Sequence, residues 1–233
     1  MSDERLEVGF LVFPNVQQLD LTGPYEVLAS WPKTRVRLVA KTLDPVLSVT
    51  RLVLKPDATF ETCPQLDVIC VPGGSGINAL LADDATLAFL RWQADGARFM
   101  TSVCTGALVL GAAGLLVGKR ATTHWASHHL LGALGAIPVR ERYVRDGKLM
   151  TGGGVTAGID FGLALLVELA GKDVAQAVQL NLEYAPAPPF EAGDPDRAPK
   201  ALRDAVRTRL ASVIAERERL VAEAAERLRL VGE

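Results

Sequence analysis

A cysteine stands where an apolar run changes abruptly into a stretch of small residues. The run at 98–103 is followed by Cys104, Thr105 and Gly106. This pattern predicts a buried strand, a sharp turn and the first residues of a helix, with the thiol at the turn. A thiol there faces the positive end of the helix, which favours the thiolate, the form that attacks electrophiles. We interpret Cys104 as a nucleophile, although a buried structural cysteine is the usual fate of a free thiol.

Two other predicted strands end in residues that could share a site with Cys104. The run at 67–71 leads into Gly73 and Gly74, whose unhindered N–H groups could approach developing charge, or could simply form a tight turn. The run at 6–13 is followed by Asp20. Open α/β sheets bind ligands at the carboxyl ends of their strands, so we expect these residues to lie together.

The spacing of apolar residues predicts the elements that would position this site. Apolar runs alternate with helical patterns, which indicates an α/β fold with a doubly wound, mostly parallel sheet flanked by helices. The predicted strands are 6–13, 35–40, 67–71 and 98–103, and the helices between them are near 22–30, 77–95 and 105–116. Later elements are a strand at 120–123, helices at 125–134, 156–170 and 172–182, and a hairpin that turns at Asp146 and Gly147.

The last fifty residues have a different pattern. A Pro-rich segment, 184–199, is predicted to run extended, and residues 200–230 read as one long amphipathic helix. Such a helix seldom stands alone, so we expect it to pack partly on a second subunit in a symmetric homodimer; packing on its own core is the alternative. We assign residues 1–233 to a single domain.

Composition limits the class of protein. Of the 233 residues, 49% are hydrophobic and 22% charged, and the formal net charge is −2, so neither disorder nor binding to nucleic acid is favoured. No apolar run approaches membrane-spanning length, and the charged first residues do not resemble a signal peptide. Three cysteines favour a reducing compartment over a disulfide framework, and we expect a cytoplasmic protein.

Four motifs together resemble the ThiJ/PfpI superfamily, which has a class I glutamine amidotransferase-like fold. They are the segments 71–74 (VPGG), 102–106 (SVCTG), 121–125 (ATTHW) and 151–154 (TGGG). The resemblance spans residues 6–230. Within the superfamily the chain is most similar to the isocyanide hydratases, which have aspartate and threonine where this sequence has Asp20 and Thr105. Glyoxalase and deglycase members usually carry glutamate at the first position, and protease-like members carry histidine at the second.

The resemblance implies a hydration that needs no cofactor and no metal, with a small isocyanide as substrate. In this interpretation Cys104 attacks the terminal carbon while protonated Asp20 delivers a proton, giving a covalent thioimidate. Asp20 then activates a water, and an N-substituted formamide leaves. The backbone N–H groups of Gly73 and Gly74 would stabilise the intermediate. Thr105 would contribute its N–H and hydroxyl, or would merely cap the helix.

Other interpretations stay open at this point. His124 could be a base for the thiol, but a hydrogen-bonded structural histidine is favoured, and the pair His124 and His128 lacks a third zinc ligand. Cys63 and Cys70 are read as structural. The competing functions are a glyoxalase or deglycase, and a non-catalytic redox sensor or chaperone whose Cys104 is oxidised. Sensor domains of AraC-type regulators share two of the motifs, but we expect no room here for their DNA-binding region.

Overall fold

The core of the protein is a seven-stranded sheet, seen in a computed structural model that describes residues 5–232. The strand order is β10-β11-β7-β6-β1-β2-β5, and every pair is parallel except the β10–β11 hairpin. The strands are β1 (Leu6–Leu11), β2 (Thr34–Ala40), β5 (Ala58–Thr59), β6 (Val68–Val71), β7 (Phe99–Val103), β10 (Tyr143–Asp146) and β11 (Leu149–Gly152). The predicted doubly wound, mostly parallel sheet is therefore confirmed.

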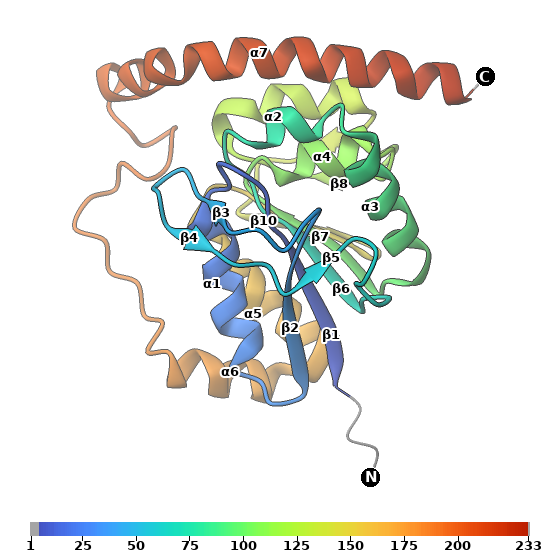
Figure 1. The fold of residues 1–233 in the computed structure, drawn as a ribbon. Coiled ribbons are helices and arrows are strands. Elements are labelled where there is room, and N and C mark those ends of the chain that lie inside the picture. The colour runs from blue at the N-terminus through green and yellow to red at the C-terminus, as the bar shows by residue number, and fades with distance from the viewer. Residues whose placement is uncertain (1–4, 233) are drawn as a thin grey trace.

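Helices cover both faces of this sheet (Figure 1). One layer holds α1 (Gln18–Ala29), α5 (Ala157–Ala170) and α6 (Lys172–Asn181). The other holds α2 (Ile77–Leu80), α3 (Asp84–Gly96), α4 (Gly106–Ala112) and the 3₁₀ segment η1 (Trp125–Leu134). Every residue of the central strands β6 and β7 is buried, as expected for strands covered on both sides.

Several boundaries differ from the sequence prediction. The helix expected over 77–95 is two helices, because the Asp83 side chain accepts a hydrogen bond from the Thr86 N–H and starts α3 afresh. The helix expected to reach residue 116 ends at Ala112, and Gly114 follows with a φ of +82°. Two short strand pairs lie outside the main sheet: β3 (Val46–Leu47) with β4 (Val53–Leu54), and β8 (Arg120–Ala121) with β9 (Ile137–Pro138).

The long helix α7 (Lys200–Gly232) lies across the outer side of α2, α4 and η1 (Figure 1). Its second half docks on these elements and buries Val221, Ala224 and Ala225. The first turns of α7 project beyond the body of the protein in Figure 1, and Leu202 there is 48% exposed. The segment before it runs without helix or strand from residue 184 to 199, as predicted. Packing on its own core, the alternative considered above, therefore holds for the second half of α7.

None of the helices within residues 5–232 combines the length and the apolar character that crossing a bilayer requires.

Candidate active site

Three loops that follow neighbouring strands meet at one end of the sheet. β1 pairs with β2 on one side and with β6 on the other, so the winding of the sheet reverses between β1 and β6. Such a reversal opens a crevice at the carboxyl ends of the strands. Asp20 after β1, Gly73 after β6 and Cys104 after β7 converge there, as the sequence predicted. Two of the three loops are in direct contact, because the Gly73 N–H donates a 2.8 Å hydrogen bond to Asp20 Oδ2.

The backbone of Cys104 forms the sharp turn that the sequence predicts. Its φ is +57°, a left-handed conformation that is costly for a residue with a side chain. Hydrogen bonds on both sides hold it: the Cys104 N–H donates to the carbonyls of Gly152 (3.1 Å) and Gly153 (2.8 Å), and Thr123 Oγ1 donates to the Cys104 carbonyl (2.7 Å). The thiol is thereby fixed at the turn, and the residue is only 6% exposed.

Asp20 is a fully buried carboxyl group in the first turn of α1. Oδ2 accepts the Gly73 N–H, whereas Oδ1 is buried and has no hydrogen-bond partner among the described residues. Burial raises the pKa of Asp20 from 3.8 to about 7, against smaller lowering contributions from the Gly73 N–H and from Cys104. At neutral pH this carboxyl group can therefore both give and take a proton.

The Cys104 thiol is neutral in the resting site. Burial raises the pKa of Cys104 well above its ordinary value, and the negative charge of Asp20 raises it further. The Thr105 N–H and the Arg217 guanidinium lower the pKa, but less. The N–H at the helix start favours the thiolate, as expected, but burial and the charge of Asp20 outweigh its effect. The site instead places a thiol beside a carboxyl group that titrates near neutrality.

Thr105 is bound to the Gly73–Gly74 turn. The Gly74 N–H donates to Thr105 Oγ1 at 3.2 Å, and the hydroxyl lies 3.4 Å from the Gly74 carbonyl. The side chain makes no capping bond on α4, so the interpretation of Thr105 as a simple helix cap is wrong. A Cβ on Gly73 would lie 2.6 Å from Thr105 N and 2.9 Å from Asp20 Oδ2, which explains why a glycine stands there.

Arg217 reaches this site from α7, and the sequence analysis missed it. It is only 6% exposed. Its guanidinium donates to Asn78 Oδ1 (3.0 Å), Ser127 Oγ (2.9 Å) and the Gly74 carbonyl (3.3 Å). One signal could have found it: Arg217 is four residues from both Val213 and Val221, which places a charge within the apolar stripe of the helix.

His124 is a structural histidine by its contacts. Its Nδ1 accepts a 3.3 Å hydrogen bond from the Ala126 N–H at the start of η1, and no hydrogen bond joins it to Cys104 among residues 5–232. Burial and the nearby Arg217 charge lower its pKa to about 4, so the ring is neutral at pH 7. His128 Nε2 lies 3.0 Å from the Val139 carbonyl oxygen instead of facing a shared ligand. In the described part of the chain, no three His, Cys, Asp or Glu residues gather as a metal site.

The two remaining cysteines, Cys63 and Cys70, are buried. Burial raises the pKa of Cys63 to about 11 and that of Cys70 to about 12, so both thiols stay protonated at neutral pH. This agrees with the structural interpretation of both residues.

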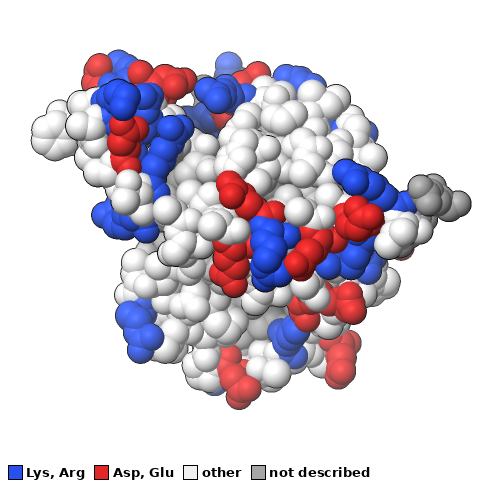
Figure 2. Space-filling model, turned by 90° about the horizontal axis from the view of Figure 1, so that it is seen from above, with Lys and Arg blue, Asp and Glu red and all other residues white. Residues whose placement is uncertain are grey.

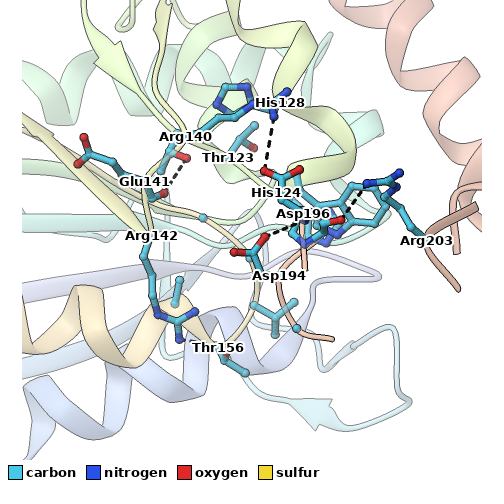
Figure 3. Close-up of a pocket in the computed structure, with 18 of the residues that line it drawn as sticks. Thr123, His124, His128, Arg140, Glu141, Arg142, Thr156, Asp194, Asp196 and Arg203 are labelled. Carbon is cyan, nitrogen blue, oxygen red and sulfur yellow. Dashed lines mark hydrogen bonds and ion pairs between the residues drawn. The ribbon is translucent and has the colours of Figure 1, made fainter. Parts of the chain in front are cut away.

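A cavity of about 460 Å³ adjoins the site. Thr123 and Gly153, which hydrogen-bond the Cys104 backbone, are among the residues that line it, and His124 lines it as well. The Pro-rich segment covers it: Figure 3 shows Asp194 and Asp196 of this segment amid the lining residues of the core. Two arginines of the loop between β9 and β10, Arg140 and Arg142, and two of α7, Arg203 and Arg207, also line it.

Comparisons with known proteins agree with this geometry. The model of the DJ-1/PfpI family matches residues 7–168. A Pseudomonas putida protein named isonitrile hydratase is 67% identical over 88% of this chain and 90% of its own length. The crystal structure of a ThiJ/PfpI family protein from Pseudomonas syringae superposes with a TM-score of 0.91 at 43% identity, covering 93% of this chain and 90% of that one. The HTH-type transcriptional regulator GbdR of Pseudomonas aeruginosa is 29% identical over 76% of this chain, which corresponds to 50% of the regulator.

Proposed function

The chain belongs to the DJ-1/PfpI family, and we propose that it is an enzyme that hydrates isocyanides to N-substituted formamides. The identity to the Pseudomonas putida isonitrile hydratase extends over nearly the whole of both chains and supports this substrate class. The observation that carries the proposal is the buried pair of Asp20 and Cys104. An isocyanide carbon needs a nucleophile and a proton on the same atom, and this pair holds one of each.

The proposed reaction begins with the transfer of the Cys104 proton to the Asp20 carboxylate. The thiolate then bonds to the terminal carbon of the isocyanide, and Asp20 delivers its proton to that same carbon, giving a thioimidate. Asp20, again a carboxylate, takes a proton from a water whose oxygen bonds to the carbon, and passes that proton to the nitrogen. The carbon–sulfur bond breaks, the hydroxyl proton returns to the sulfur, and the formamide leaves.

The neutral Cys104 of the resting site fits this sequence of steps. The charged thiolate forms only when the carboxylate beside it accepts the proton, so the buried site carries one negative charge throughout. Among the described residues, Oδ1 of Asp20 has no hydrogen-bond partner, so it is available to accept and donate the proton. The pKa of about 7 is suited to both directions of transfer at neutral pH.

Thr105 and the two glycines support the pair in this proposal. The N–H groups of Gly73 and Gly74 already donate to Asp20 and Thr105, respectively. Their predicted donation to a reaction intermediate would require these bonds to break. We therefore assign them a positioning role: Gly73 orients the carboxyl group, and Gly74 orients the Thr105 hydroxyl, which can hold the incoming water. The Thr105 N–H, which lowers the pKa of Cys104, stabilises the departing thiolate.

The decisive test gives purified protein cyclohexyl isocyanide and, separately, methylglyoxal, in water labelled with ¹⁸O. We expect N-cyclohexylformamide that carries the label, measured by mass spectrometry, and no turnover of methylglyoxal. Conversion of methylglyoxal alone would make the protein a glyoxalase. No turnover of either substrate, together with peroxide oxidation of Cys104, would favour the redox-sensor reading.

A further inference from the structure

Arg217 is a buried cation without an anionic partner of its own. Its three hydrogen-bond acceptors, an amide oxygen, a hydroxyl and a backbone carbonyl, are all neutral. No ion pair joins it to an Asp or Glu among residues 5–232, and the adjacent Glu216 binds the amide nitrogen of Asn78 instead. Burial of an uncompensated charge costs several kcal/mol, so a residue placed this way needs a negative charge nearby.

Two groups act on Arg217 as negative charges: the Cys104 thiolate, and Glu216, which shares the Asn78 amide with it. The charges of Arg217 and Cys104 act on each other: the guanidinium lowers the pKa of Cys104, and the thiolate raises the pKa of Arg217, although burial lowers the latter overall. A chain of hydrogen bonds also leads from Arg217 to the Gly74 carbonyl, and from the Gly74 N–H to Thr105. Charge and geometry thus both connect α7 to the site.

We propose that Arg217 is a positioning residue whose charge balances the single negative charge of the Cys104–Asp20 pair and whose hydrogen bond fixes the Gly74 turn. This inference rests on the proposed role of Cys104 as nucleophile, but not on the identity of the substrate. The proposal gives the C-terminal helix a direct role in the site. Without Arg217, only the Thr105 N–H would stabilise the buried thiolate.

The pH dependence of Cys104 is the property that this proposal predicts. The titratable groups around the thiol are Asp20 from α1 and Arg217 from α7. His124, before η1, is close to Arg217 but neutral above a pH of about 4. Glu216 raises the pKa of Arg217 but is not among the groups that shift the pKa of Cys104. Above this pH, therefore, Cys104 and Asp20 titrate as a coupled pair with two apparent pKa values. The charge of Arg217 shifts these values.

The experiment measures the rate at which iodoacetamide alkylates Cys104 between mild acid and alkaline pH, with the site identified by peptide mass spectrometry. In Arg217→Gln, which keeps hydrogen-bond donors but loses the charge, the apparent pKa should rise by at least about one unit, and the rate at neutral pH should fall about ten-fold. Arg217→Lys keeps the charge and should stay close to wild type. The matched control is Arg227→Gln, on the same helix, whose guanidinium donates to the Leu81 carbonyl (2.7 Å) away from Cys104.

Three results would overturn the proposal. The first is an unchanged alkylation profile in Arg217→Gln that is folded, as judged by near-ultraviolet circular dichroism. The second is a shift in Arg217→Lys as large as that in Arg217→Gln, and the third is an Arg217→Lys variant that does not fold. A guanidinium with a purely structural role would give either of the last two. Formamide production is recorded separately, so a wild type without isocyanide turnover would contradict the proposed function and leave the alkylation result to judge Arg217.

Discussion

At the scale of single residues, the proposed mechanism has two buried acids, Asp20 and Cys104, share one proton. Burial raises the pKa of both Asp20 and Cys104, and the negative charge of Asp20 raises the pKa of Cys104 further, whereas the Cys104 thiol lowers the pKa of Asp20. A cysteine paired with a histidine base would instead rest as an ion pair. In the proposed mechanism the thiolate forms only when Asp20 accepts its proton. The same carboxyl group would then protonate the carbon and later deprotonate the water.

Replacement of the nucleophile tests the covalent step. Cys104→Ala should abolish formamide production and leave the fold intact, because loss of one sulfur atom creates little cavity. Wild type mixed with substrate should show a transient adduct, on the Cys104 peptide, with the mass of the isocyanide. Substantial turnover in a Cys104→Ala sample of verified sequence would eliminate the covalent mechanism.

Two substitutions of Asp20 separate its acid–base function from its shape. Asp20→Asn is nearly isosteric and should lose almost all activity, because an amide cannot cycle the proton. Asp20→Glu keeps the acid but moves it by roughly an ångström, which should cost about 100-fold in kcat/KM by misorientation. Near-normal rates in Asp20→Asn would transfer the acid–base role to another group.

The raised pKa of Asp20 also predicts how stability depends on pH. The folded state holds this proton with a pKa of about 7, and the ordinary value is 3.8. The contribution of the proton to stability is therefore complete below 3.8 and is lost as the pH rises through 7. As the pH rises from about 5 to about 8, the wild type should lose this contribution and Asp20→Asn should not. The unfolding free energy of the variant minus that of wild type should therefore increase by about 2 kcal/mol.

Urea unfolding of both proteins at the two pH values measures this difference. His124 has the opposite effect, since its lowered pKa removes stability as the pH falls from 6.5 toward about 4. It is present in both proteins, so its contribution cancels in the difference. A difference that is independent of pH would mean that Asp20 titrates near its ordinary value.

At the scale of elements, the sequence predicted the sheet well because its signals are local. The buried strands are continuous apolar runs, and the residues that follow them had to meet at the carboxyl ends of parallel strands. The meeting of Asp20, Gly73 and Cys104 at one end of the sheet was predicted in this way. The local sequence could not predict how deeply these residues are buried. It therefore could not predict that the Cys104 thiol is neutral.

Other features depended on tertiary contacts between distant segments. Arg217 lies 113 positions after Cys104 in a helix rich in arginine, and its importance arises only from the docking of α7. The hydrogen-bond partners of the Gly73 and Gly74 N–H groups could not be predicted for the same reason, because they are the side chains of Asp20 and Thr105 from distant segments. Likewise, the break at Asp83 interrupts a pattern that is helical on both sides.

The turn between β6 and α2 has to be built with glycine for the site to form. Gly73→Ala would place a Cβ against Thr105 N and Asp20 Oδ2, at 2.6 and 2.9 Å, so both groups must shift. A shift of this size should lower kcat/KM about 100-fold while the fold persists. Gly132→Ala in η1 is the control, because an added Cβ there meets nothing within 4 Å. Equal activity of the two variants, measured as formamide production, would contradict the role of the turn.

At the scale of the whole molecule, α7 contacts the candidate active site through Arg217. We infer from this connection that residues 1–233 form a single functional domain, with the Pro-rich segment as the link that brings α7 back over the core. Seen from the side that carries α7, basic and acidic side chains are interspersed (Figure 2). Neither sign forms a broad field there, in keeping with the net charge of −2 and with a small-molecule substrate.

The first half of α7 predicts how two chains associate. Leu202, Val206, Leu210 and Val213 follow one another at intervals of four, four and three residues, so they share one side of the helix. All four retain exposure in the single chain, in contrast to the buried Val221 in the second half. Apolar side chains in such a row are covered most simply by the same row on a second copy, or by the body of that copy, about a two-fold axis.

We therefore predict a symmetric homodimer, with a sedimentation mass of twice 24.9 kDa at micromolar concentration. Leu202→Glu combined with Leu210→Glu should weaken it, because two charges would be buried in an apolar contact. Thr208→Glu with Ser212→Glu is the matched control: it adds the same charges to the opposite side of the same helical turns, where both residues are exposed. Arg217 is later in the helix than all four substituted positions. Apart from any effect of losing the dimer, neither double variant should therefore change the rate of Cys104 alkylation. A wild-type mass of one chain would show that the exposed half of α7 has no partner of its own kind.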